Sequence, residues 1–510
     1  MPELREVSPQ STTLSHPLDG TATRDAPEAR SGLPPWTIAE LPAAPRPRGL
    51  GWLSAVGPGI IVLGISIGSG EFLLGPAAFV RYGLSMLWVV AVGALLQTNF
   101  NLELMRYTLA TGEPAFTGFM RTRPHSTFWA WVYSLAYFVQ MGWPGWAGTA
   151  AGAAFFLWLR RLPGAGESNL IYGIGVGFFL LCGVILLMGR RIERTLEYLN
   201  WILVSLIIGG FGILALAFVP AEVWRAALAG FAGFDTRSGT FQFVPAGADF
   251  GLLAAFAGFV GAGGVSNITL SNWARDKGYG MSSHVGYIPA AMAGRKVVLA
   301  HTGSTFEPSP EAMGRWRGWW RIVYADQWGV YFLGALLGMT LPGLLYVTFI
   351  PAGTTLGGLG IAAALADAIA ATKGALFGGS IALLGVWILF KAQLDILEGT
   401  TRAITDILWT GSRRVRAWRG GDVRLVYYTV LACAILWGVV ALRLAQPIVL
   451  IKMAANMAAI VFIVGALHLL YVNTRLLPAA LRPSLVRRAG LVGLALFYGF
   501  FVALWLRSLL

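Results

Sequence analysis

A group of small residues interrupts the first apolar segment of this 510-residue sequence. Gly68, Ser69 and Gly70 lie near the midpoint of the segment, and Glu71 follows them directly. Glycine destabilises a helix because its backbone is free to adopt other conformations. An interrupted helix exposes backbone N–H and C=O groups that can bind an ion. The Glu71 carboxylate could in addition hold sodium, a proton or a hard divalent cation such as magnesium.

A second interruption of the same kind lies in a later apolar segment. Gly263 and Gly264 are followed by Ser266 and Asn267. Successive backbone amides at the ends of half-helices attract anions, and hydroxyl and amide side chains add neutral hydrogen bonds. The two interruptions together predict a pocket for a small planar oxyanion. Bicarbonate is the simplest such substrate, because it is small, carries one charge, and both donates and accepts hydrogen bonds. Magnesium and a small carboxylate or amino acid are the alternatives.

The composition is that of an integral membrane protein. Apolar residues make up 56% of the sequence and charged residues 12%, compared with about 25% charged residues in ordinary soluble chains. The formal charge of +14 comes from short basic clusters between apolar runs, so it predicts membrane topology and no nucleic-acid partner. The two cysteines and five histidines show no metal-ligating or catalytic spacing. We therefore expect no resident metal, no cofactor and no enzymatic activity.

Apolar segments long enough to cross a bilayer recur along most of the chain. We predict an all-α fold of eleven transmembrane helices, over residues 53–80, 84–106, 127–158, 169–189, 197–219, 248–273, 324–349, 376–409, 424–443, 446–472 and 489–507.

Most Lys and Arg residues between these segments fall in the loops that follow even-numbered helices. Such loops remain cytoplasmic, so we expect a multi-pass protein of the bacterial inner membrane, with the N-terminus in the cytoplasm and the C-terminus outside. Residues 1–50 are polar and rich in proline, and we predict a disordered cytoplasmic tail. Residues 51–510 form the membrane domain. The sequence leaves the oligomeric state open.

The interruptions fall in helices 1 and 6, which are five helices apart. This pattern is typical of inverted-repeat secondary transporters, which bind substrate and coupling ion at unwound backbone near the bilayer midplane. We predict repeat one over 53–219, repeat two over 248–472 and an extra helix over 489–507. Close helix packing is the alternative explanation, since small residues four apart, such as Gly64 and Gly68, also mediate ordinary helix contacts.

Charged residues also lie within two later helices. Helix 8 carries charges spaced three or four residues apart, so neighbouring side chains could form local ion pairs. Its charged residues are Lys391, Asp395, Glu398, Arg402 and Asp406. Asp395 and Glu398 are the predicted ligands of a coupling ion, either sodium or a proton. In helix 10, Lys452 and Asn456 share one face, and Asn456 is a predicted substrate residue. Whether Lys391, Arg402 and Lys452 are structural or functional stays open.

The chain resembles the Nramp metal transporters over about residues 50–510. The resemblance rests on the Gly57-Pro58 start, the spacing to the first interruption, the basic loop after helix 6, and the Asn473-Thr474-Arg475-Leu476-Leu477-Pro478 end of helix 10. It implies the LeuT-type fold of the APC superfamily, with two inverted five-helix repeats and one or two extra helices.

The departures from that family bear on the substrate. The metal transporters carry Asp-Pro-Gly-Asn in helix 1, where this chain has Gly68, Ser69, Gly70 and Glu71. Their Met-Pro-His in helix 6 corresponds to Gly264-Val265-Ser266, so the soft sulfur ligand that favours transition metals is missing. Helix 3, where the family keeps acidic residues linked to proton movement, has none here. We therefore expect a divergent branch that has lost transition-metal transport.

Overall fold

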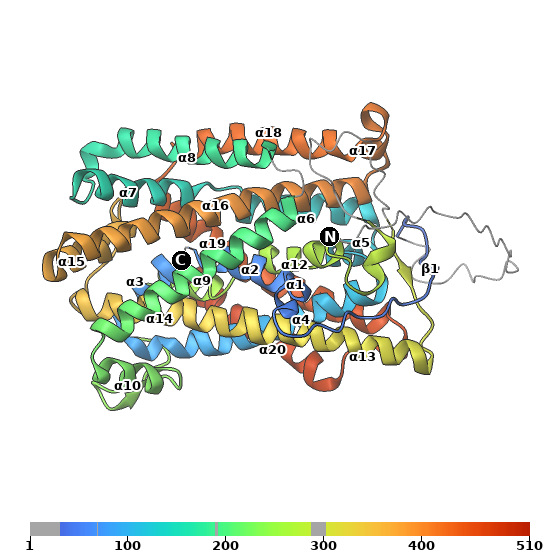
Figure 1. Ribbon diagram of the computed structural model, residues 1–510, viewed down its shortest axis with the longest axis horizontal. Helices are drawn as coiled ribbons and strands as arrows, with labels where there is room; N and C mark the ends of the chain where they lie inside the picture. The colour runs from blue at the N-terminus through green and yellow to red at the C-terminus, as the bar shows by residue number, and fades with distance from the viewer. Residues whose placement is uncertain (1–30, 69, 189–191, 287–301) are drawn as a thin grey trace, which may run out of the picture.

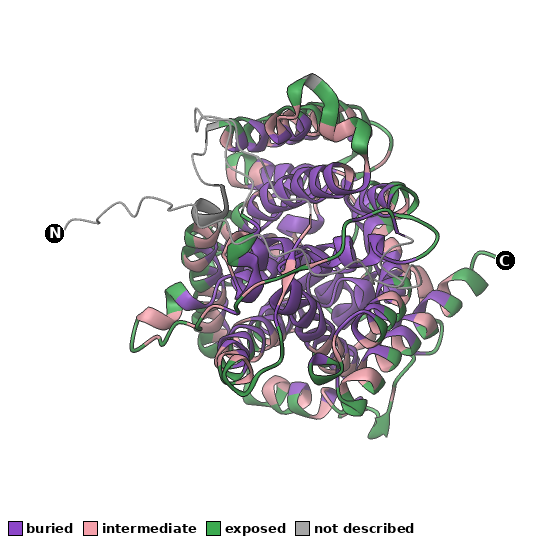
Figure 2. Cartoon of the chain, turned by 90° about the vertical axis from the view of Figure 1, so that its right-hand side faces the viewer, coloured by how far each residue is buried: buried purple, intermediate pink, exposed green. Residues whose placement is uncertain are grey.

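The computed structural model describes residues 31–68, 70–188, 192–286 and 302–510 as a bundle of long helices that run side by side (Figure 1). Ser69 and residues 1–30 of the expected tail lie outside the described residues. Figure 2 shows that the buried residues concentrate in the middle of the bundle and that the exposed residues lie on its rim.

The first half of the chain forms ten helices that the structure describes. They are α1 (Gly51–Ala55), α2 (Pro58–Ser66), α3 (Gly75–Tyr82), α4 (Leu87–Thr111), α5 (Ala115–Met120), α6 (Ser126–Met141), α7 (Gly145–Leu159), α8 (Ser168–Met188), α9 (Ile192–Phe218) and α10 (Ala221–Gly230). Between α2 and α3, Gly70–Leu74 form a π-helical turn. Pro58 suits the first turn of α2, because the N–H that proline lacks would have no partner within the helix.

The second half continues the bundle. Its helices are α11 (Phe250–Gly258), α12 (Val265–Asp276), α13 (Pro310–Tyr324), α14 (Leu333–Phe349), α15 (Ala364–Lys373), α16 (Ala375–Gly411), α17 (Arg413–Ala417), α18 (Val423–Ala441), α19 (Pro447–Arg475) and α20 (Leu485–Arg507). A π-helical segment over Ala325–Phe332 joins α13 to α14.

Two pairs of very short strands complete the described structure. β1 (Thr37–Ile38) pairs in parallel with β4 (Ser304–Thr305), and β2 (Phe234–Asp235) pairs antiparallel with β3 (Thr240–Phe241).

Within the described residues, nine helical stretches are long and apolar enough to cross a membrane. The chain is therefore a multi-pass membrane protein. The predicted helices over 127–158 and 248–273 are both divided, and none of their halves exceeds 16 residues. The count of eleven spans, the inverted repeats and the orientation of the termini stay predictions.

The predicted helices over 127–158 and 324–349 differ from the structure in ways that the sequence did not indicate. The helix expected over 127–158 is split into α6 and α7, because Pro144 has no N–H to donate and its ring crowds the preceding turn. The helix expected over 324–349 begins earlier, at Pro310, and the tryptophans of that extension, such as Trp319, are buried.

The segment over residues 31–50, which we call the N-terminal strap, is folded against the bundle, so the prediction of a disordered tail is wrong for these residues. Leu41 is fully buried, and Trp319 Nε1 donates a hydrogen bond to Pro42 O at 2.9 Å. The Arg121 guanidinium lies over the Trp36 ring at 4.9 Å. A few apolar anchors and β1 thus hold a segment whose composition is mostly polar, which composition alone did not indicate.

Candidate functional site

The interruption of the first membrane helix lies where the sequence predicts it. α2 ends at Ser66, and the helical backbone resumes at Gly70 as a π-helical turn. The Glu71 side chain is fully buried. Its carboxylate accepts hydrogen bonds from the Ser66 hydroxyl and, at 3.4 Å, from the Gly68 N–H. The Glu71 side chain therefore links the residues on the two sides of the interruption by hydrogen bonds.

The second interruption separates α11 from α12. Gly261, Gly263 and Gly264 have φ angles of +86°, +81° and +49°, which L-residues with a side chain rarely adopt. The Gln140 side chain of α6 spans this turn. Its Nε2 donates to Gly263 O at 2.9 Å, and its Oε1 accepts from the Val265 N–H at 3.0 Å. Gln140 thus forms hydrogen bonds with part of the backbone that the sequence predicts to bind an anion.

The two interruptions touch each other. A Cβ on Gly70 would come within 1.9 Å of Phe259 O, so only glycine allows the two backbones to approach this closely. The Trp146 ring of α7 packs against the Phe259 ring at a centroid distance of 5.8 Å. The buried Trp146 Nε1 has no hydrogen-bond partner among the described atoms. It lies 3.5 Å from the Cβ that a side chain at Gly68 would carry. A free donor is therefore available beside the first interruption.

A buried ion pair from α16 lies next to α2. Lys391 Nζ lies 2.7 Å from Asp395 Oδ2, which confirms the local pairing expected from their spacing. A Cβ on Gly64 would come within 1.9 Å of Lys391 Nζ and 1.7 Å of Asn200 Oδ1. The Lys391 ammonium thus lies against the last turn of α2, next to the first interruption, and Asp395, a predicted coupling-ion residue, lies beside it.

Other predicted site residues have different surroundings. Asn267 Nδ2 donates to Asn101 Oδ1 at 2.9 Å and to Tyr331 OH at 3.1 Å, so this amide ties α12 to neighbouring helices. Ser266 is buried in the first turn of α12. Asn456 is buried on α19, and its Oδ1 has no hydrogen-bond partner among the described atoms. Lys452 is half-buried on the same helix.

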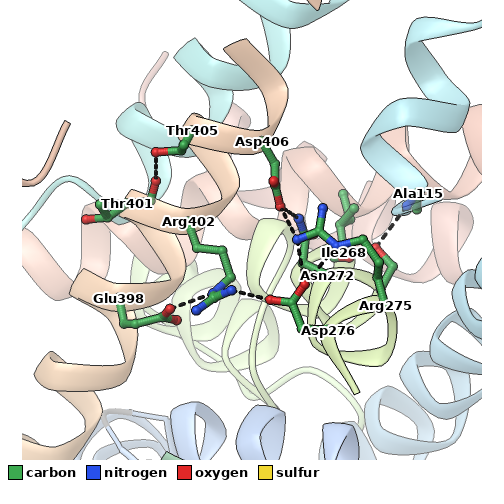
Figure 3. A network of polar contacts seen from close by, with 11 residues as sticks. Ala115, Ile268, Asn272, Arg275, Asp276, Glu398, Thr401, Arg402, Thr405 and Asp406 are labelled. Atoms are coloured by element: carbon green, nitrogen blue, oxygen red, sulfur yellow. Dashed lines mark hydrogen bonds and ion pairs between the residues drawn. The ribbon is translucent and has the colours of Figure 1, made fainter. Parts of the chain in front are cut away.

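Glu398, the third predicted coupling-ion residue, belongs to a separate ionic network between α12 and α16 (Figure 3). Its Oε1 lies 2.5 Å from Arg402 Nε, as the spacing along α16 predicts. The local Arg402–Asp406 pair that the spacing also allows does not form, because Asp406 pairs with Arg275 of α12 at 2.9 Å.

Sequence reasoning missed several polar residues around the interruptions. Gln140 and Trp146 lie in the predicted helix over 127–158, and Asn200 lies in the predicted helix over 197–219. Gln140 and Asn200 are each the one amide side chain of an apolar segment, and that is the signal that could have found them. Asp326 is a further case, since it accepts hydrogen bonds from the N–H groups of Gly57 at 3.0 Å and Gly59 at 2.8 Å.

Within the described residues, no group of three or more His, Cys, Asp and Glu side chains is placed to hold a metal ion. The described centre instead combines one ammonium, two carboxylates, neutral amides and an indole N–H. It could bind a small ion together with a proton.

Comparisons with known proteins give a relationship at the level of the fold. No family model matches the sequence, and no curated protein matches it. Among solved structures, two mutants of the Eremococcus coleocola manganese transporter align with TM-scores of 0.61 and 0.60, at 15% and 14% identity. Each alignment covers 91% of this chain and 88% of the transporter. This chain shares its fold with that transporter.

A third structure extends the comparison. The same manganese transporter in complex with an aromatic bis-isothiourea substituted compound aligns with a TM-score of 0.55 at 14% identity, over 92% of this chain and 91% of the other. The manganese-transporter fold agrees with the all-α membrane fold that the resemblance implied. At this level of identity the shared fold does not carry over the substrate.

Proposed function

We propose that this protein is a secondary transporter that carries a small ion across the membrane by alternating access. The observation that carries the proposal is the contact of the two interrupted helices at their interruptions, where Gly70 meets Phe259 O. Unwound backbone at membrane depth is tolerated where it is enclosed by protein or lines a cavity, and in transporters it forms the site for substrate and coupling ion. The shared fold with a named transporter supports the same class, and an enzyme or a receptor would not need this arrangement.

The substrate we propose is a small oxyanion of the bicarbonate type. Two buried donors support it: Trp146 Nε1 beside Gly68, and the Lys391 ammonium beside Gly64. The close approach of the two backbones favours a small substrate. A buried charge needs a partner, so the anion would share the Lys391 charge with Asp395.

A proton is the coupling ion we favour, although sodium is the alternative. The centre holds Lys391 with Asp395 and Glu71, so two carboxylates face one ammonium among the described side chains. Because this centre already has an excess of negative charge, an anion would enter it more favourably together with a proton. Sodium would instead need several oxygen ligands at a place that the Lys391 ammonium already reaches.

A divalent cation is the second proposed substrate, because the centre has an excess of carboxylate and Glu71 lies at the interruption itself. The neighbours in fold are named manganese transporters, which keeps manganese beside magnesium in this proposal. A small carboxylate or amino acid ranks third.

Uptake into proteoliposomes tests these proposals. The purified protein would be supplied in turn with radiolabelled bicarbonate at alkaline pH, where dissolved carbon dioxide is scarce, and with manganese, magnesium and alanine. We expect the wild type to take up bicarbonate and Lys391→Met to lose this uptake. Lys373→Met, which replaces an exposed lysine, is the control and should retain it. Manganese or magnesium uptake without bicarbonate uptake, lost in Glu71→Gln, would replace the anion with a cation. Alanine uptake alone would point to the third substrate, and no uptake of any probe would overturn small-ion transport.

A further inference from the structure

Five buried charged side chains form one ionic network between α12 and α16 (Figure 3). Arg402 lies between Glu398, at 2.5 Å, and Asp276. Arg275 lies between Asp276, at 2.7 Å, and Asp406, at 2.9 Å. The chain of contacts therefore runs from Glu398 through Arg402, Asp276 and Arg275 to Asp406.

The charges in this network do not balance. Three carboxylates share two guanidinium groups, and every side chain in the network is at most 5% exposed. A fully ionised network would carry one negative charge without a partner in a low-dielectric interior, which is strongly unfavourable. A proton on one of the three carboxylates would remove this charge in the arrangement described.

The charged and titratable groups around the network do not supply the missing positive charge among the described residues. Lys391 pairs with Asp395, one turn further along α16, and Lys277 pairs with Glu197 at 2.6 Å. Arg416 donates to the carbonyl groups of Trp409 and Thr410 at the end of α16.

The remaining titratable groups that face this stretch of α16 carry no positive charge. Tyr137 of α6 and Tyr427 of α18 interact electrostatically with Glu398, and Cys182 of α8 interacts with Asp395. Glu71 lies beyond Lys391, at the first interruption, and is itself acidic.

The contacts distinguish the three carboxylates. Asp276 lies between both arginines, so it has the strongest reason to be ionised. Asp406 Oδ2 accepts a hydrogen bond from Asn272 Nδ2 at 2.5 Å and also pairs with Arg275, so two donors stabilise its charge, although its Oδ1 is buried without a hydrogen-bond partner among the described atoms. Glu398 has Arg402 on one oxygen, whereas its Oε2 is buried without a hydrogen-bond partner among the described atoms. The Tyr427 hydroxyl, also buried, has none either.

We infer that Glu398 is the proton-carrying group of this network and binds the proton that moves with the substrate. Proton binding converts the Glu398 carboxylate to a neutral acid, and release on the other side of the membrane restores it, so atoms and charge balance over one cycle. Glu398 lies seven residues, or about 10 Å along a helix, from Lys391 on α16. Glu398 is therefore the member of the ionic network that lies nearest to Lys391 along α16. This inference rests on the proposed transport function.

Infrared difference spectroscopy tests the protonated acid without any transport assay. Full-length protein at neutral pH should show a carboxylic acid C=O band that shifts in D2O, and one component of it should be lost in Glu398→Gln. Glu167→Gln, in an exposed ion pair with Arg161, is the matched control and should keep the whole band. The absence of this band from the wild-type protein would overturn the inference. That result does not depend on whether the Glu398→Gln variant folds. A component lost in Asp406→Asn instead of Glu398→Gln would also overturn the assignment.

A transport measurement separates this inference from the proposed function. In proteoliposomes, an inward proton gradient should stimulate bicarbonate uptake by the wild type and by Glu167→Gln. The ratio of uptake with and without the gradient should fall to one in Glu398→Gln. If that ratio stays at the wild-type level, transport stands and the coupling role of Glu398 fails. If the infrared component is lost in Glu398→Gln but no probe is taken up, the proton site stands and the transport proposal fails.

Discussion

Gln140 Oε1 accepts a hydrogen bond at 3.0 Å from the N–H of Val265, the first residue of α12. Nε2 of the same amide donates to Gly263 O at 2.9 Å. One side chain of α6 therefore satisfies a donor and an acceptor of the backbone on the two sides of Gly264. We call this pair of Gln140 hydrogen bonds the brace. A methyl group at Gly264 would come within 2.3 Å of Gln140 Oε1, and the φ of +49° also disfavours a side chain, so the position requires glycine for both reasons.

Replacing this brace should destabilise the second interruption. Gln140→Leu keeps a side chain of similar size but leaves the Val265 N–H and the Gly263 carbonyl unsatisfied, at a cost of about 1–3 kcal/mol each. We expect a lower midpoint of thermal unfolding in detergent. Gln242→Leu, in a partly exposed loop, is the control and should stay close to the wild type. Equal midpoints for Gln140→Leu and the wild type would show that the brace contributes nothing.

Asp326 holds the start of α2. Its two carboxylate oxygens accept from the N–H groups of Gly57 and Gly59, and asparagine offers one oxygen instead of two. Asp326→Asn should cost about 1–2 kcal/mol locally, as the loss of a helix cap does. Hydrogen exchange over residues 51–66 should become faster than in the wild type. Asp367→Asn, partly exposed on α15, should leave that exchange rate unchanged. The role assigned to Asp326 is wrong if the two variants behave alike.

Glu113 predicts a pH dependence of stability outside the membrane-spanning segments. Burial alone would raise the pKa of Glu113, but the Arg121 guanidinium, the Tyr107 hydroxyl and the Gly303 N–H together hold it below its ordinary value of 4.5. A lowered carboxyl pKa stabilises the folded state above the unfolded pKa, and that contribution disappears as the pH falls through the folded pKa. Thermal stability should therefore decline as the pH drops below 4.5.

Glu113→Gln should remove that decline and lower stability at neutral pH by about 3 kcal/mol, because it leaves the buried Arg121 without its carboxylate partner. Glu222→Gln, on the exposed face of α10, should follow the wild-type pH profile. A wild-type profile in Glu113→Gln would assign the acid sensitivity to another group.

The N-terminal strap gives a matched pair of aliphatic substitutions. Leu41 is fully buried, whereas Ile38 is 66% exposed. Leu41→Ala should weaken the docking of the strap by about 2–3 kcal/mol, and Ile38→Ala should change it by about 0.5 kcal/mol or less. Limited proteolysis within residues 31–50 measures this, with faster cleavage expected in Leu41→Ala alone. Equal cleavage of both variants would mean that Leu41 does not anchor the strap.

The sequence predicted the elements of this protein better than their contacts. Membrane helices could be predicted because apolar composition over about 20 residues is a local property. The interruptions at Gly68–Gly70 and Gly261–Gly264 could be predicted for the same reason, since a glycine's conformational freedom does not depend on its neighbours in space. The pairs Lys391–Asp395 and Glu398–Arg402 follow from the geometry of one helix.

Tertiary structure decided which groups meet at those elements. Asp406 has Arg402 one turn away on its own helix, yet it pairs with Arg275, because α12 brings a second guanidinium to it. Gln140 fills the second interruption and Trp146 lies beside the first, although neither residue has a sequence pattern that links it to those glycines. Residues 31–50 are polar on average, and contacts with distant parts of the chain order them, among them the packing of Leu41 and Trp36 and the pairing of β1 with β4. Composition and spacing act along the chain, so the sequence by itself determined where helices form and where they are interrupted. The partners that surround those interruptions come from helices far apart in sequence, and packing alone selects them.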